Sequence, residues 1–132
     1  MLNDMANHTV ILLLDHVRAK RPYIRTVSKW VQELGLRGAF IFQWKLILLL
    51  LQGQTEDIME YLSRHRTQCI DVDSKGRKCK ERMMTVIAEV QGPPIEDRFV
   101  VQELNSADEL KRFFIEAGLK DIYESYVRQL SE

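Results

Sequence analysis

The stretch His8-Thr-Val-Ile-Leu-Leu-Leu14 is a continuous apolar run, and a second one, Leu46-Ile-Leu-Leu-Leu-Leu51, follows further along the chain. Uninterrupted runs of this length, without alternating polar residues, are typical of strands covered on both faces. Each run therefore predicts a central strand of a sheet. Such strands need partner elements on both sides, which leaves an apolar face for a terminal helix to bury.

Between these runs the sequence changes to a helical pattern. Apolar residues recur at steps of three and four, which marks the buried stripe of an amphipathic helix. Pro22 suits the first turn of this helix and Gly35 suits its end, so the pattern predicts a helix over 22–34. The buried stripe consists of Tyr23, Val27, Trp30, Val31 and Leu34.

The middle of the chain continues with a hairpin and a second helix. The apolar stretch 39–42 precedes the run 46–51 by a very short link, which is typical of a hairpin. Thr55 is the expected N-cap of the next helix, which should fade near Arg66. The stretch Asp71-Val-Asp-Ser-Lys-Gly76 then predicts a turn.

The last third of the chain predicts two strands followed by helix. Alternation predicts a strand over 84–89, and Phe99 to Leu104 gives one more. Ser106 and Glu109 have the spacing of a capping box, so a helix should begin there. After Gly118 a final helical stripe runs to Leu130.

The predicted order is strand, helix, strand, strand, helix, strand, strand, helix. Its first six elements match the ferredoxin-like split β-α-β sandwich, in which helices cover one face of an antiparallel sheet. The expected fold class is α+β, with an added C-terminal strand and helix. We expect one domain over 8–130, preceded by a flexible N-terminus over 1–7.

Composition excludes several classes of protein. The 132 residues carry 19 basic and 19 acidic side chains, and a net charge of zero argues against a uniformly basic nucleic-acid binder. The longest apolar block, 39–51, is shorter than the ~20 residues of a membrane-spanning helix, so no membrane partner is expected. Cys69 and Cys79 are expected to be reduced thiols, as in a cytoplasmic and nuclear protein.

No metal or cofactor site is expected. The loop that begins at Asp71 resembles a calcium loop, but Lys75 and Arg82 stand where oxygen ligands belong. A zinc site from His65, Cys69 and Cys79 would lack close ligand pairs and a fourth ligand.

No catalytic residues are expected either. Asp15 and His16 are adjacent, but neighbours along a strand point to opposite faces, so capping and packing are their expected roles. Arg18 and Arg21 stand where an acylphosphatase-like enzyme would hold phosphate, but the glycine-rich cradle of such an enzyme is absent.

Charge is unevenly distributed along the neutral chain. Residues 16–37 carry six bases and one acid, residues 64–82 seven bases and three acids, and residues 96–132 nine acids and five bases. The two basic segments either form solvated faces of separate elements or meet in one surface that binds an acidic partner. The candidate partner-binding residues are Arg18, Lys20, Arg21, Arg25, Lys75, Arg77, Lys78, Lys80 and Arg82.

Several motifs, in one order, carry a family resemblance. They are Asp15-His-Val-Arg-Ala-Lys20, the strand 45–53, the turn from Asp71 to Glu81, and 108–120. Together they resemble the C-terminal domain of RWD domain-containing proteins, nearest to the enhancer of SUMO conjugation in that family. More distantly, the end of the chain resembles the C-terminal domain of a spliceosomal pre-mRNA processing factor, which contacts RNA.

The resemblance implies a non-catalytic protein-interaction domain of a SUMO-pathway regulator. Its partner would be a protein, for example of the SUMO-conjugation machinery, and no small-molecule substrate is expected. In the family, binding to the conjugating enzyme is attributed to an RWD domain that precedes this segment and is expected to be absent here. The splicing relative leaves RNA binding through the same basic surface as the alternative.

Overall fold

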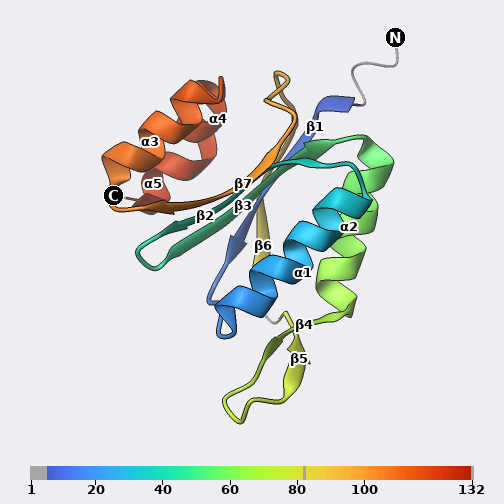
Figure 1. Cartoon of the computed structure of the whole chain (residues 1–132). Helices are drawn as coiled ribbons and strands as arrows, with labels where there is room; N and C mark the ends of the chain where they lie inside the picture. Colours follow the sequence, from blue (N-terminus) through green and yellow to red (C-terminus); the bar gives the residue numbers. More distant parts are fainter. Residues whose placement is uncertain (1–5, 82, 132) are drawn as a thin grey trace.

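The computed structural model describes residues 6–81 and 83–131, which form a five-stranded sheet with helices on both faces (Figure 1). The sheet order is β6-β1-β3-β2-β7. Its strands are β1 (His8–Leu14), β2 (Arg37–Gln43), β3 (Leu46–Gly53), β6 (Met84–Gln91) and β7 (Phe99–Leu104).

The two apolar runs occupy inner positions of the sheet, as predicted. β1 lies between β3 and β6, antiparallel to both, and β3 lies between β1 and β2. The order β6-β1-β3-β2 is that of the ferredoxin-like sandwich, so the predicted fold class is confirmed. The added strand β7 pairs with β2 in parallel and extends the sheet by one position.

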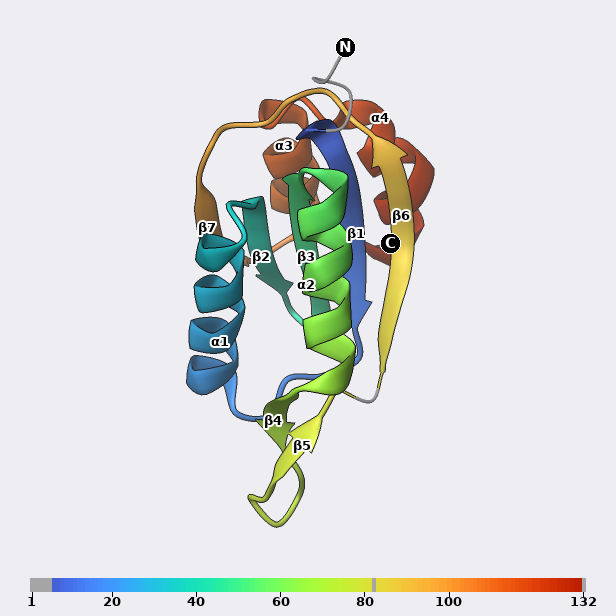
Figure 2. The ribbon, with the colours of Figure 1, turned by 90° about the vertical axis from the view of Figure 1, so that its right-hand side faces the viewer.

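Two helices cover one face of the sheet, α1 (Lys20–Glu33) and α2 (Thr55–Thr67) (Figure 2). The predicted buried stripe of α1 is confirmed at Tyr23, Val27, Trp30 and Val31, although the helix begins two residues earlier than expected. The N-cap prediction at Thr55 is wrong, because Gln54 holds that position. The Thr55 hydroxyl instead lies 3.0 Å from Nδ1 of His8.

The opposite face is covered by the C-terminal helices α3 (Ala107–Glu116), α4 (Lys120–Ile122), η2 (Tyr123–Val127) and α5 (Arg128–Ser131). The predicted final stripe is helical but not one regular helix, because the π-helical turn η2 separates α4 from α5. Leu110, Phe114, Tyr123 and Val127 are buried against the sheet. No helix in the described residues is long and apolar enough to cross a membrane.

A small hairpin is inserted between α2 and β6 and projects beyond one end of the sheet (Figure 1). It consists of β4 (Cys69–Val72) and β5 (Lys78–Lys80). The predicted turn lies at its tip, where Gly76 has a φ of +80°.

The start of the described chain is tied to the sheet. Arg37 donates to the carbonyl of Ala6 at 2.8 Å, and the amide of Gly92 donates to the carbonyl of Asn7 at 3.0 Å. The remainder of the expected flexible segment, 1–5, lies outside the described residues.

The cap of α3 gives a first testable prediction. The Ser106 hydroxyl accepts from the amide of Glu109 at 3.1 Å, and the Glu109 carboxylate accepts from the amide of Asn105. Ser106→Ala should therefore lower the free energy of unfolding by about 1 kcal/mol in urea titrations. Ser63→Ala, at an exposed position within α2, is the matched control. Equal losses in the two variants would contradict this role of Ser106.

Candidate functional site

The two basic segments of the sequence meet at the start of β4. The Asp71 carboxylate accepts hydrogen bonds from the backbone amides of Arg18 at 2.9 Å and Ala19 at 2.8 Å. Asp71 is only 9% exposed, so its charge is directed into the protein. This contact fastens the loop after β1 to the hairpin and places Arg18 beside it.

A pocket of about 290 Å³ lies at this junction, and we call its lining the basic site. Its acidic side chains form hydrogen bonds within the protein. Asp73 accepts hydrogen bonds from the backbone amides of Lys75 and Arg77, and Glu81 accepts one from the Tyr23 hydroxyl. Arg18, Lys75 and Lys80 form no ion pair with another described residue. The basic site is lined by the basic residues His16, Arg18, Lys75, Arg77 and Lys80, together with Asp71, Val72, Asp73, Ser74, Cys79 and Glu81.

Some of the candidate binding residues lie elsewhere. Lys20 forms an ion pair with Glu103 at 2.6 Å, and its ammonium group lies 4.3 Å from the centre of the Phe42 ring. Arg21 and Arg25 are exposed on α1 but do not line the basic site. Lys78 is exposed on β5, and Arg82 lies outside the described residues.

The expectation that Asp15 and His16 point apart is wrong. β1 ends at Leu14, so both residues lie in a bend where strand alternation no longer applies. His16 Nδ1 lies 3.2 Å from the Asp15 carboxylate. Both side chains are more than half exposed, so the pair is a solvated contact at the edge of the basic site.

A buried polar network adjoins the basic site through Glu81. His65 is fully buried, with Nδ1 2.9 Å from the Tyr61 hydroxyl and Nε2 2.9 Å from the Tyr23 hydroxyl. The Tyr23 hydroxyl in turn donates to the Glu81 carboxylate. Because a carboxylate only accepts, the bonds run from Tyr61 to His65, from His65 Nε2–H to Tyr23, and from Tyr23 to Glu81.

The network holds a charge in the protein interior. Burial by itself would raise the pKa of Glu81, but its contacts with His65, Tyr23 and the amide of Met83 outweigh burial and hold that pKa below 4.5. Burial raises the pKa of both tyrosines, so they stay neutral donors. Since Glu81 directly follows β5, the ionised network anchors the base of the hairpin to both helices.

The sequence contains one signal for this network. His65 continues the buried stripe of Ile58, Tyr61 and Leu62 along α2, a spacing that assigns it to the core. With both ring nitrogens bonded to tyrosines, His65 has no lone pair to offer zinc.

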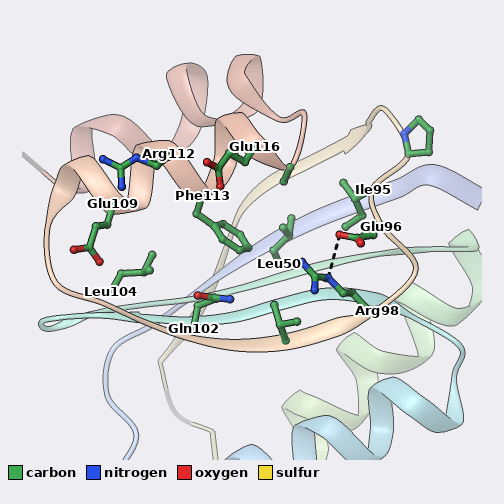
Figure 3. Close-up of a pocket in the computed structure, with 14 residues that line it drawn as sticks. Leu50, Ile95, Glu96, Arg98, Gln102, Leu104, Glu109, Arg112, Phe113 and Glu116 are labelled. Atoms are coloured by element: carbon green, nitrogen blue, oxygen red, sulfur yellow. Dashed lines mark ion pairs between the residues drawn. The ribbon is translucent and has the colours of Figure 1, made fainter.

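A second hollow lies along β7, at one edge of the sheet (Figure 3). This groove of about 420 Å³ lies between β7, α3 and the loop that precedes β7. Figure 3 shows Phe113 pointing down toward Leu50, with Gln102 and Leu104 along β7. Its one internal ion pair joins Arg98 and Glu96 at 3.1 Å. No sequence motif indicates this groove.

Trp44 is a further exposed feature that sequence reasoning missed. It is 78% exposed in the turn between β2 and β3 and has a φ of +57°, which non-glycine residues rarely adopt. Because β1 is antiparallel to β3, with Leu14 opposite Ile47, this turn and the loop carrying Arg18 lie at the same end of the sheet.

Comparisons with known proteins place the chain among relatives. It is 43% identical over 132 residues to RWD domain-containing protein 3 of Xenopus tropicalis, covering 98% of this chain and 50% of the relative. It is 42% identical to the Homo sapiens protein of the same name, covering 91% of this chain and 46% of that protein. No family model matches the chain.

Two solved structures share the fold at low identity. The BLUF structure of BlrP1 has a TM-score of 0.58 and 18% identity, over 96% of this chain and 88% of its own. Full-length HypF in its phosphate- and nucleotide-bound form has a TM-score of 0.54 and 15% identity, over 76% of this chain and 12% of its own. These likenesses support the α+β fold alone. The chain spans about half the length of these curated relatives. Their similarity over that half shows that the chain belongs to the family of RWD domain-containing proteins.

Proposed function

We propose that this chain is a protein-interaction domain that binds an acidic protein surface through the basic site. The observation that carries the proposal is the division of charge there. The carboxylates of Asp71 and Glu81 are directed inward and bonded, whereas Arg18, Lys75 and Lys80 carry no partner charge among the described residues. A patch left with unpaired cations attracts a negatively charged partner and speeds its association.

Trp44 supports a protein partner. Tryptophan and arginine are the residue types most enriched among the energetic hot spots of protein interfaces. The exposed Trp44 and the basic site lie toward the same end of the sheet, so one partner of ordinary size could contact both.

We further propose that the partner belongs to the SUMO-conjugation machinery and that the protein works in the cytoplasm and nucleus. This step rests on the motif resemblance to the enhancer of SUMO conjugation and on membership of the RWD domain-containing family. Among the described residues, no hydrogen bond joins the side chain of Ser74 or Cys79 in the basic site to a base, so we propose binding without catalysis.

The test measures affinity for purified SUMO, the SUMO-activating enzyme and the SUMO-conjugating enzyme, each labelled with a fluorophore. Arg18→Glu with Lys80→Glu should weaken binding of the true partner by roughly tenfold or more, as expected when cations at an interface are reversed. Lys29→Glu with Arg66→Glu has the same net charge and alters exposed cations outside the basic site.

Each outcome is informative. Binding that both double variants weaken equally would show a general charge effect and overturn the assigned site. If none of the three proteins binds, the SUMO assignment is wrong. Binding of a structured RNA that weakens steeply with salt, with a log–log slope of roughly 0.7 per single-strand phosphate contact, would favour the RNA alternative.

A further inference from the structure

The outer edge of β7 carries unpaired backbone groups. Among the described residues, β7 is the last strand of the sheet and pairs only with β2. The carbonyl of Arg98 accepts from the amide of Gly38 at 2.9 Å, and alternate residues of a parallel strand face the same neighbour. Val100, Gln102 and Leu104 therefore face β2, so the amide and carbonyl groups of Phe99, Val101 and Glu103 are directed outward.

The groove of Figure 3 runs beside this open edge. Side chains of alternate strand residues point to the same face of a sheet. Val100, Gln102 and Leu104 line the groove from β7, opposite Phe113 on α3. A strand added to the β7 edge would send every second side chain into the same groove, which is how edge strands recognise extended peptides.

The charge of the groove favours a basic occupant. Its lining carries three acids and two bases, and because Glu96 pairs with Arg98, Glu109 and Glu116 remain against Arg112. Figure 3 shows Glu109 and Glu116 toward opposite ends of the α3 side of the groove. Seven residues of helix rise by about 10.5 Å, and two strand residues four positions apart are separated by about 13 Å. Lys or Arg at positions i and i+4 of a strand could thus meet both glutamates, on either side of the single Arg112.

We propose that the β7 edge and its groove bind an extended basic peptide segment as a sixth strand of the sheet. The segment places Lys or Arg, then an apolar residue, then Lys or Arg at alternate positions that face the groove. The apolar side chain enters the groove beside Gln102, on the side of Phe113, and the backbone pairs with Phe99, Val101 and Glu103. This surface is separate from the basic site, so the two proposals succeed or fail independently.

The test uses an amide NMR titration of the ¹⁵N-labelled chain with the synthetic peptide acetyl-Ser-Lys-Thr-Val-Thr-Lys-Ser-amide. Saturable shifts should appear at residues 99–104 and along α3. Val101→Pro removes only an outward amide, a position at which edge strands tolerate proline, and should weaken binding roughly tenfold or more. Val101→Ala keeps the amide and should bind within about threefold of the parent chain.

Charge is tested separately. A peptide with Glu in place of both Lys should bind at least roughly tenfold more weakly, because it loses two charge-assisted contacts with the glutamates of the groove. Glu116→Gln should weaken binding of the Lys peptide by about threefold or more, whereas Asp121→Asn, outside the groove, should not. No shifts at millimolar peptide, equal binding of the Glu peptide, or binding that persists in the folded Val101→Pro variant would each overturn the proposal.

Discussion

Gly38→Ala should destabilise the protein by more than about 4 kcal/mol, a loss that leaves the chain largely unfolded at room temperature. Gly38 lies in β2 with a φ of +146°, a conformation that residues with a side chain rarely adopt. A Cβ atom at this position would lie 1.9 Å from the backbone oxygen of Leu50 in the neighbouring strand. Because that oxygen belongs to the centre of the sheet, neither strand can move aside without breaking the pairing of β2 with β3.

Gly35→Ala is the matched control for this prediction. Gly35 also has a positive φ, +65°, but a Cβ atom there would meet nothing within 4 Å. It should therefore cost only the conformational penalty, about 1 to 2 kcal/mol. Urea unfolding followed by circular dichroism gives both values. Equal losses for the two glycines would mean that the close approach of β2 to β3 does not determine stability.

Glu81→Gln should lower the free energy of unfolding by about 3 kcal/mol near neutral pH, as expected when a partly buried, bonded charge is removed from its network. Only 6% of the Glu81 side chain is exposed, and both of its oxygens accept hydrogen bonds, one from Tyr23 and one from the amide of Met83. A glutamine can accept one of these bonds but brings an amide donor where an acceptor is required.

The same variant should change the response to acid. The folded state holds the pKa of Glu81 below its ordinary value of 4.5, so the unfolded state binds the proton more tightly. The stability that Glu81 contributes is therefore fully present above pH 4.5 and is lost as the pH falls through the lower, folded-state value. The Glu81→Gln variant has no carboxylate at this position to protonate. Its free energy of unfolding should therefore approach that of the parent chain as the pH falls.

Glu60→Gln provides the control, since Glu60 pairs with Arg64 on an exposed face of α2. Surface pairs of this kind contribute little, so its unfolding curves should stay within about 1 kcal/mol of the parent at every pH. Urea titrations across the acid range test both variants. A difference in free energy of unfolding between the parent chain and Glu81→Gln that stays constant from neutral pH into acid would contradict an ionised Glu81 in the folded protein.

The architecture could be predicted because apolar patterning is a local property. The run at 8–14 has the bounds of β1, and its lack of polar alternation correctly assigned it to the interior of the sheet. β4 and β5 were missed because a sequence such as Lys78-Cys-Lys80 has no apolar face, and these strands exist through the turn that joins them. The break at η2 was missed because the stripe continues through it without interruption.

The candidate site was only partly predictable because it depends on contacts between distant residues. Charge counting identified both basic segments, but their meeting depends on Asp71 capturing the amides of Arg18 and Ala19, more than 50 positions away. Lys20, two residues after Arg18, is instead directed to Glu103. Glu81 stands in a run of lysines and arginines, where a carboxylate is expected to be solvated, and only the fold places it next to Tyr23.

The central claim is that Arg18 and the hairpin form one binding site for an acidic protein surface. An amide NMR titration of the full chain with an acidic peptide, such as hexaglutamate, tests it most directly. We predict saturable shifts at residues 16–18 and 72–80 that disappear in the Arg18→Glu, Lys80→Glu double variant and persist in the Lys29→Glu, Arg66→Glu control. Shifts that are scattered over the surface, or that survive reversal of Arg18 and Lys80, would contradict the account.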